Sequence, residues 1–259
     1  MAILPIDLPL YGLLGRKLSH SFSQGYFRQK FKEEGITADY ILLELEHIEQ
    51  LPAQLAAIPQ LRGFNVTIPY KQAILPFLSW LSPLAKAAGA VNTVVVTESG
   101  LHGYNTDILG LETALLEKLA QMPFYPAPEA LILGNGGGSQ AARIALAGMG
   151  HSCHTAARHP TDAELDWSHL HTTAGQVLIA RMGIIINTTP IGMYPDSEAL
   201  VPLPYEVIGP QHLLFDLIYN PAITPFLAQG QARGAQTLNG LPMLHAQAEE
   251  AWKVWGGGG

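Results

Sequence analysis

The sequence predicts an α/β fold built from two units. Three observations support this. Apolar strand patterns alternate with helical patterns along most of the chain, as in α/β proteins with mainly parallel pairing. Residues 121–128 contain three prolines in eight positions, which is typical of a boundary between units. The segment 129–150 then reads as an apolar strand, a glycine turn and a helix of small residues.

The composition limits the class of protein. Hydrophobic residues make up 48% of the 259 residues and charged residues 14%, which suits a well-buried globular enzyme. The formal net charge is -7 and no block of Lys and Arg occurs, so nucleic-acid binding is not expected. No stretch approaches the roughly 20 apolar residues of a membrane span, and no basic leader precedes the apolar start. With one cysteine, Cys153, the expected location is the reducing cytoplasm.

The expected elements of the first unit follow from periodicity and from turn residues. Residues 22, 26, 27 and 31 are apolar at helical spacing, and Gly35 is placed to end that helix. Glu98-Ser99-Gly100 supplies the turn of an expected β-hairpin over 89–107. In order, the expected elements are strand 10–15, helix 22–34, strand 39–46, helix 47–61, strand 63–68, a helical stretch through Leu84, and the hairpin.

The second unit is expected to continue the alternation. Two apolar strands, at 183–195 and 212–221, each end in polar residues and proline. In order, the expected elements from residue 108 on are helix 108–119, the strand and helix of 129–150, strand 151–159, these two strands, helix 224–234 and helix 242–256.

"GFNVTIPYK", residues 63–71, combines one apolar strand face with several polar groups. Phe64, Val66 and Ile68 alternate as in a half-buried strand. Asn65 and Thr67 lie on the other face, and Pro69 ends the ladder because it has no amide hydrogen. Lys71 follows two residues later, so an amide, a hydroxyl and an ammonium group come close together.

Asp107, the last residue of "GYNTD", precedes the apolar pattern of the helix at 108–119. One interpretation is a helix cap. The other pairs the carboxylate with Lys71, where it would orient the ammonium group and adjust its pKa for proton transfer. The two interpretations are compatible.

The glycine turn contains Gly134, Gly136, Gly137 and Gly138 in the spacing G-x-G-x-x-S, with Ser139 in the third slot. Such a turn between strand and helix lets the backbone approach a pyrophosphate, where free N–H groups and the helix dipole favour the anion. A purely structural turn is the alternative, and the strand–turn–helix context favours the nucleotide interpretation.

The end of the next strand indicates which cofactor binds. The strand ends in Ala157, Arg158 and His159, with no carboxylate before Asp162. An NAD site typically has a carboxylate there, which binds the ribose hydroxyls, whereas arginine suits the 2′-phosphate of NADP. The alternative for Arg158 is a solvated loop residue. No metal is expected, because the five histidines between 151 and 171 lack zinc-ligand spacing.

Eight segments together resemble the shikimate dehydrogenase family. They run in family order over nearly the whole chain: "GLLGRKLSHSFS", "GFNVTIPYK", "AGAVNTVV", "GYNTD", "LGNGGGSQAA", "INTTPIGM", "DLIYNP" and "NGLPMLHAQA". The resemblance implies an N-terminal α/β substrate domain, residues 1–107 completed by the C-terminal helix 240–259, and a Rossmann-type NADP domain, residues 108–239. It also implies reduction of 3-dehydroshikimate to shikimate with NADPH, in aromatic amino-acid biosynthesis, by a monomer or homodimer.

The resemblance also implies a role for each matching residue. Lys71 would be catalytic with Asp107 as its partner. The substrate-binding residues would be Ser19 and Ser21 for the carboxylate, Asn65, Thr67, Asn92 and Gln247 around the ring, and Tyr219 closing the pocket. The cofactor-binding residues would be Gly134, Gly136, Gly137, Gly138, Arg158, Thr188, Leu217 and Gly240. A strand end that delivers several fixed polar groups suits a small polyhydroxy acid.

Two segments depart from the family pattern. The usual G-A-G-G-A is here "GNGGG", and the usual "NRT" is here "ARH", so two polar contacts near the adenosine phosphate are missing. Three alternatives stay open: a relative acting on quinate or an amino analogue, a non-catalytic binding paralogue, and a nucleotide-binding regulator. Loss of Lys71 or Asp107 would mark the paralogue, and neither is lost.

Overall fold

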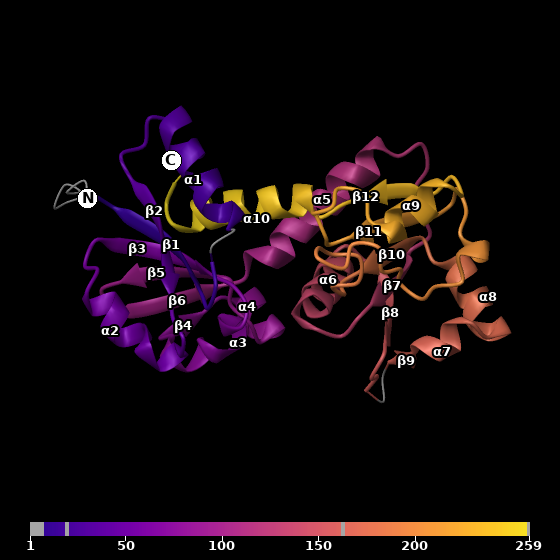
Figure 1. The fold of residues 1–259 in the computed structure, drawn as a ribbon, viewed down its shortest axis with the longest axis horizontal. Coiled ribbons are helices and arrows are strands. Elements are labelled where there is room, and N and C mark those ends of the chain that lie inside the picture. The colour runs from indigo at the N-terminus through magenta and orange to yellow at the C-terminus, as the bar shows by residue number, and fades with distance from the viewer. Residues whose placement is uncertain (1–7, 19–20, 162–163, 258–259) are drawn as a thin grey trace. The chain divides into compact units, whose positions relative to one another are not determined.

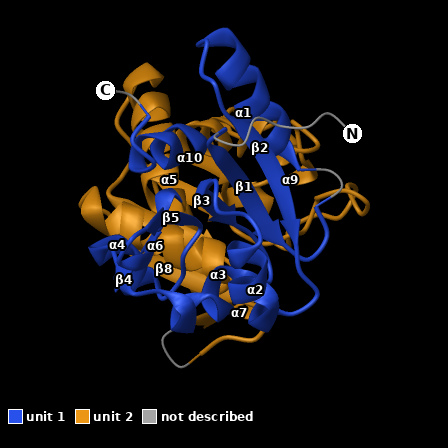
Figure 2. Cartoon of the chain, turned by 90° about the vertical axis from the view of Figure 1, so that its left-hand side faces the viewer, with its two compact units in different colours: residues 1–106, 248–259 blue, residues 107–247 orange. Residues whose placement is uncertain are grey.

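The computed structural model describes residues 8–18, 21–161 and 164–257. The chain forms two compact units, shown in blue and orange in Figure 2. Unit 1 is Met1–Thr106 with Ala248–Gly259, and unit 2 is Asp107–Gln247. The second boundary falls inside helix α10 (Leu241–Val254), not before it as the sequence indicated. The first half of α10 belongs with unit 2 because it packs against helix α5 (Thr106–Gln121) at Gly110.

Unit 1 is a mixed six-stranded sheet in the order β2-β1-β3-β5-β6-β4. Strand β1 pairs in parallel with β2 and β3, whereas β5 runs antiparallel to β3 and β6. The strands are β1 (Leu10–Gly15), β2 (Asp39–Glu44), β3 (Leu61–Val66), β4 (Trp80–Leu81), β5 (Thr93–Thr97) and β6 (Gly100–Tyr104). The helices are α1 (Phe22–Glu33), α2 (Leu51–Ala56), α3 (Tyr70–Ala73) and α4 (Pro83–Ala88), with 3₁₀ turns at Ile48–Gln50 and Leu75–Phe77.

Prolines account for the largest differences from the expected elements of unit 1. The helix expected at 47–61 shrinks to α2 and a 3₁₀ turn, and ends before Pro59, since a residue preceding proline disfavours helical geometry. The helical stretch expected through Leu84 is broken into α3, a 3₁₀ turn containing Pro76, β4, and α4, which starts at Pro83. The strand expected to reach Ile68 ends at Val66, and Ile68 is 80% exposed.

The C-terminal half of α10 completes the core of unit 1. Trp252 and Trp255 pack with the rings of Tyr11, Phe27 and Tyr40. The Trp255 indole N–H donates to the Val94 carbonyl of β5 at 2.9 Å. A Cβ on Gly63 would lie 2.3 Å from the Trp255 Nε1 atom, so only glycine admits this ring beside β3.

Unit 2 is a six-stranded parallel sheet in the order β12-β11-β10-β7-β8-β9 (Figure 1). The chain moves outward from β7 to β8 and β9, then returns to the other side of β7 for β10, β11 and β12. This reversal defines a doubly wound sheet with a switch point between β7 and β10. The α/β fold class with a Rossmann-type second unit is thereby confirmed.

The elements of unit 2 bring polar loops to the carboxyl ends of the strands. The strands expected at 183–195 and 212–221 are shorter than predicted, and their polar second halves are loops. The strands are β7 (Glu129–Leu133), β8 (Ser152–Ala157), β9 (Leu165–Asp166), β10 (Ile184–Asn187), β11 (Leu213–Asp216) and β12 (Gln236–Leu238). Besides α5, the helices are α6 (Gly137–Gly148), α7 (Trp167–Leu170), α8 (Thr173–Arg181) and α9 (Pro225–Gln231).

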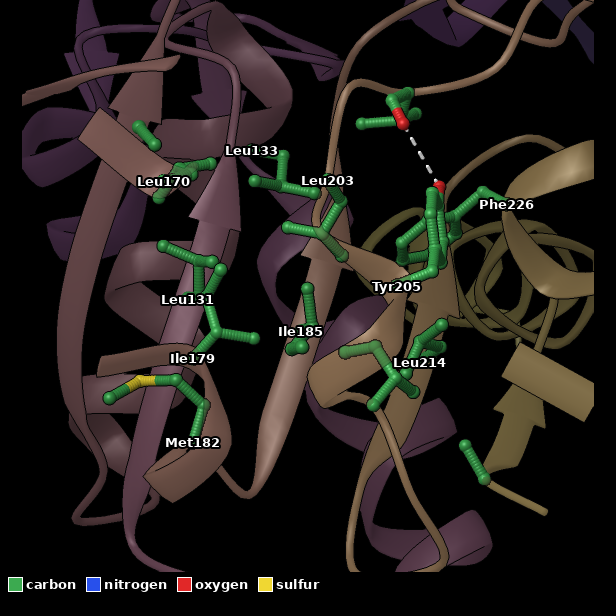
Figure 3. Packing of buried hydrophobic residues seen from close by; sticks show 14 of the residues in the cluster. Leu131, Leu133, Leu170, Ile179, Met182, Ile185, Leu203, Tyr205, Leu214 and Phe226 are labelled. Atoms are coloured by element: carbon green, nitrogen blue, oxygen red, sulfur yellow. Dashed lines mark hydrogen bonds between the residues drawn. The ribbon is translucent and has the colours of Figure 1, made fainter. Parts of the chain in front are cut away.

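The central strands of unit 2 are buried, as a parallel sheet requires. Leu131 of β7, Ile185 of β10 and Leu214 of β11 all point into one apolar cluster, shown in Figure 3. The Tyr205 hydroxyl in that cluster donates to the Val201 carbonyl at 3.0 Å. Across the described residues, no helix is long and apolar enough to cross a membrane.

Candidate functional site

The switch point of unit 2 brings together two predicted cofactor residues. Gly134 follows β7 and Thr188 follows the neighbouring strand β10. The Thr188 hydroxyl donates to the Leu133 carbonyl at 2.7 Å. A Cβ on Gly134 would lie 2.8 Å from that hydroxyl oxygen, and Gly134 has a φ of 106°. Glycine is therefore needed at this turn both for backbone conformation and for close approach.

The rest of the glycine turn is not explained by packing alone. A Cβ on Gly136 or Gly137 would meet nothing within 4 Å, so the fold itself has room for a side chain there. Helix α6 begins at Gly137, where its first N–H groups have no intrahelical acceptor. Ser139 in its first turn is 1% exposed, and within the described residues its hydroxyl has no hydrogen-bond partner. Open space, free donors and a buried hydroxyl fit a phosphate ligand.

A second group of predicted cofactor residues gathers around Leu217, directly after β11. A Cβ on Gly138 would lie 3.1 Å from the Leu217 Cδ1 atom. A Cβ on Gly240 would lie 2.1 Å from the Leu217 carbonyl oxygen, so a larger residue at 240 would push the loops apart. The Gly240 N–H donates to the Ile218 carbonyl at 3.0 Å. The structure thus joins the glycine turn to the loop at the far end of the expected cofactor site.

Asp216, a residue that the sequence analysis missed, joins the end of β10 to the segment between β11 and α9. It is fully buried at the end of β11 and accepts hydrogen bonds from the Asn187 amide (3.0 Å), the Thr224 hydroxyl (2.6 Å) and the Ile218 N–H (3.1 Å). Burial raises the pKa of Asp216 to about 6, although these donors favour the carboxylate. Its place at the end of the strand in "DLIYNP" was the available signal.

The end of β8 carries Arg158, whose side chain is exposed. Its guanidinium carbon lies 5.7 Å from the centre of the Trp167 ring. Ala157 beside it is buried, and the His159 carbonyl accepts from the Asn135 amide of the glycine turn at 3.0 Å. Asp162 lies outside the described residues.

Glu164 is a second residue that sequence reasoning missed. Its Oε2 accepts from the Asn135 amide at 3.1 Å and from the Thr161 N–H at 2.8 Å. The Thr161 N–H is the main cause that lowers the pKa of this carboxyl, with Asn135 and the Arg143 guanidinium acting in the same direction. The glycine turn and the loop after β8 are therefore joined by hydrogen bonds of Asn135, one of the residues that depart from the family pattern.

In unit 1, backbone hydrogen bonds gather Thr67, Lys71 and Asn92. The Val91 N–H donates to the Lys71 carbonyl, and the Val66 N–H donates to the Asn92 carbonyl, each at 2.8 Å. The Thr67 N–H donates to the Leu14 carbonyl of β1 at 2.9 Å. Three of the predicted polar groups thus lie at the carboxyl end of β3, on segments that are fixed by the sheet.

Asn65 is buried and hydrogen-bonded inside unit 1, and its role in lining the ring pocket stays a prediction. It is 5% exposed, and its Oδ1 accepts from the Tyr40 hydroxyl at 2.8 Å. Its Nδ2 donates to the Thr93 hydroxyl at 3.1 Å and to the Asn92 carbonyl at 3.3 Å. Asn65 was expected on a polar strand face, and on that face it bonds with residues of β2 and β5 in the same unit.

Asn92 holds the start of α5. Its Oδ1 accepts from the Thr106 N–H at 2.7 Å, and its Nδ2 donates to the Thr106 hydroxyl at 3.0 Å. Because the helix begins at Thr106, Asp107 lies in the first turn and is not the cap residue. The capping interpretation of Asp107 is therefore wrong, and the position that remains places its carboxylate where the helix dipole favours an anion.

Ser21 occupies the N-cap position of α1 without acting as a cap. Its hydroxyl makes no capping hydrogen bond. In the described part of the chain this buried hydroxyl has no partner at all. A buried hydroxyl without a partner is costly, which points to a ligand that satisfies it. Ser19 lies outside the described residues.

Gln247 and Tyr219 complete the predicted set. Gln247 is buried in α10, and its backbone N lies 2.8 Å from where a Cβ on Gly110 would be, one turn after Asp107. Tyr219 follows β11 and is 42% exposed, so its ring is accessible. The described ranges contain no group of three or more His, Cys, Asp or Glu side chains that could hold a metal ion.

Comparison with known proteins gives the same family in three ways. A family model described as "Shikimate dehydrogenase substrate binding domain" matches residues 13–94. The shikimate dehydrogenase (NADP(+)) of Syntrophomonas wolfei is 36% identical over 94% of this chain and 89% of its own length.

Two solved structures show how far the likeness extends. The Thermus thermophilus shikimate 5-dehydrogenase in complex with NADP(H) and shikimate has a TM-score of 0.80 and 30% identity, over 96% of this chain and 92% of its own. The Corynebacterium glutamicum quinate dehydrogenase in complex with NAD has a TM-score of 0.84 and 25% identity, over 96% of this chain and 94% of its own.

Proposed function

Because the chain belongs to the shikimate dehydrogenase family, we propose that it catalyses the NADPH-dependent, reversible reduction of 3-dehydroshikimate to shikimate. The single observation that carries this proposal is the gathering of Thr67, Lys71 and Asn92 at the end of β3. A nucleotide-binding regulator would not need this set of polar groups. We place the reaction in aromatic amino-acid biosynthesis in the cytoplasm.

The substrate is held by a set of polar side chains. Ser19 and Ser21 bind the carboxylate, and the unpartnered hydroxyl of Ser21 supports this assignment. Thr67, Asn92 and Gln247 bind the ring hydroxyls, and Tyr219 closes the pocket. Such fixed polar groups orient a small ring so that one of its carbons faces the reacting groups.

Lys71 and Asp107 transfer the proton to and from the reacting oxygen of the substrate. During reduction the substrate oxygen gains a proton, and in the reverse direction its hydroxyl loses one. Lys71 is positioned by its carbonyl bond to Val91, and Asp107 follows Thr106, which Asn92 holds. We assign the proton transfer to the two residues together rather than to either one alone.

The residues of unit 2 fit NADP. Gly136, Gly137 and Ser139 offer the open space, helix N–H groups and buried hydroxyl that a pyrophosphate needs. Leu217 and Gly240 lie at the nicotinamide end, Thr188 binds the cofactor beside the glycine turn, and Arg158 binds the 2′-phosphate. When bound, NADPH supplies the hydride.

The test is a spectrophotometric assay of the purified chain with shikimate or quinate and with NADP or NAD. We expect reduced cofactor to form fastest with shikimate and NADP, and Lys71→Ala to abolish most of the signal. Faster turnover of quinate would assign the chain to the quinate branch of the family. No turnover with either acid would overturn the proposal. Light scattering on the same sample distinguishes the monomer from the homodimer, the two states that we propose.

A further inference from the structure

Trp167 is an aromatic residue that contacts the proposed cofactor site without belonging to it. Strand β9 pairs with β8 so that Asp166 lies opposite Ala157, which brings the next residue of each strand close together. Those residues are Trp167, the first of α7, and Arg158. The guanidinium lies over the indole at 5.7 Å, within the range of a cation–π contact.

The indole itself is fixed. Its N–H donates to the Ala156 carbonyl at 2.9 Å, and that same carbonyl accepts from the Gly134 N–H at 2.8 Å. The ring also packs against the apolar cluster of unit 2. Trp167 is thereby held in register with the first glycine of the proposed phosphate turn.

Stacking on one face of a guanidinium leaves its donors available. The five N–H groups of arginine lie in the plane of the group, so a ring beneath that plane does not compete with a phosphate at its edge. A free, exposed arginine would lose rotamer freedom when it binds a ligand, and stacking removes part of that loss in advance. This support matters more here, because Ala157 is apolar and buried and supplies no second donor.

The opposite side of the loop is fixed as well. Asn135 donates to the His159 carbonyl and to Glu164, and Glu164 also accepts from the Thr161 N–H. Arg158 therefore extends from a backbone that is tied on one side to the glycine turn, while its guanidinium rests on Trp167 on the other.

We propose that Trp167 is a positioning residue that sets the preference for a 2′-phosphorylated cofactor by holding the Arg158 guanidinium. The proposal rests on the proposed use of NADP. Trp167 then affects the affinity only for ligands that carry the 2′-phosphate, and only while Arg158 is present.

The experiment is a double-mutant cycle on Trp167→Leu and Arg158→Ala. The readouts are the ratio of kcat/KM for NADP to that for NAD, and calorimetric affinity for adenosine 2′,5′-bisphosphate against adenosine 5′-monophosphate. Exposed cation–π contacts are worth about 0.5–1 kcal/mol, so Trp167→Leu should lower both ratios about two- to five-fold. The loss should come from KM for NADP, with kcat and the NAD parameters unchanged. In the Arg158→Ala background, Trp167→Leu should have no further effect.

Two controls and one substitute variant make the result specific. Trp167→Phe keeps a ring face and loses the indole N–H, and it should retain most of the preference. Arg233→Gln removes a contact of the same 5.7 Å length, to Tyr205, and should leave the ratios unchanged. If Trp167→Leu does not fold, Trp167→Met takes its place, since methionine fills irregular space.

The two hypotheses fail differently. A wild type that uses NAD as well as NADP contradicts the proposed cofactor. A wild type that prefers NADP, with the preference intact in Trp167→Leu or reduced equally with and without Arg158, contradicts the role of Trp167 alone.

Discussion

The two units present their proposed ligand contacts in different ways. Unit 2 uses backbone at the ends of parallel strands, where Gly134, Gly138 and Gly240 allow close approach. Unit 1 uses side chains on a mixed sheet. A buried hydrogen-bond network of Tyr40, Asn65 and Asn92 holds the backbone that carries these side chains. Binding through the backbone therefore depends on where glycines stand, whereas side-chain chemistry depends on satisfied buried hydrogen bonds.

The chemistry is expected to depend on unit 1. Lys71→Ala should lower kcat by about 10²- to 10⁴-fold, the usual scale for losing a proton-transfer group. Substrate affinity should change less, because Ser21, Thr67 and Asn92 remain. Steady-state kinetics in both directions measure the effect, and near wild-type kcat would show that Lys71 is not the catalytic residue.

The loops of unit 2 are expected to carry a pH-dependent stability. Burial raises the pKa of Asp216 from 3.8 to about 6, so the folded protein keeps a proton that the unfolded chain releases. The stability that Asp216 contributes is thus present below about pH 4 and lost as pH rises to about 6, a change of about 3 kcal/mol.

Asp216→Asn should remove this part of the pH dependence. Urea unfolding of wild type and variant between pH 4 and 7 measures the difference between their free energies of unfolding. The difference should shift in favour of the variant as pH rises. A difference that stays constant over this range would contradict the raised pKa of Asp216.

The network in unit 1 is expected to matter for stability and for the site together. Asn65→Ala leaves the Tyr40 hydroxyl and the Thr93 hydroxyl short of partners, which should cost about 1–3 kcal/mol in the free energy of unfolding. Tyr40→Phe removes only one of these bonds and serves as the milder control. Chemical denaturation measures both, and an Asn65→Ala variant as stable as wild type would show that the network does not support the unit.

The Ser21→Ala variant distinguishes a role of this hydroxyl in substrate binding from a role in capping α1. Ser21→Ala should raise KM for shikimate by an amount equal to about 1–3 kcal/mol of binding and leave kcat nearly unchanged. Its melting temperature should stay the same, because the hydroxyl makes no capping bond. A lower melting temperature with an unchanged KM is the pattern of a cap, and would return Ser21 to that role.

Alanine variants of two glycines in unit 2 distinguish a role in stability from a role in cofactor binding. Gly136→Ala should change the free energy of unfolding by less than about 0.5 kcal/mol, since its Cβ would meet nothing, and should raise KM for the cofactor. Gly134→Ala is the matched variant that should destabilise the fold, because of its φ of 106° and the 2.8 Å approach to Thr188. Equal thermal stability of the two variants would contradict the assignment of Gly134 to the fold and Gly136 to the cofactor.

Local rules of the chain were enough for much of the fold and of the site. Backbone conformation and periodicity between near neighbours predict the glycine turn, the hairpin at residue 99 and the end of α1 before Gly35. The same rules placed Thr67, Lys71 and Asn92 on segments that the structure joins by backbone bonds.

Contacts between distant residues decided the rest. Whether Asn65 faces a ligand or the core depends on Tyr40, 25 residues away, and the start of α5 depends on Asn92, 14 residues before Thr106. Trp167, Glu164 and Asp216 gain their importance from partners on other strands and loops. A local pattern determines which face a side chain occupies in a strand or helix. Only the packed structure determines what lies against that face, because burial and hydrogen bonding are properties of the whole fold.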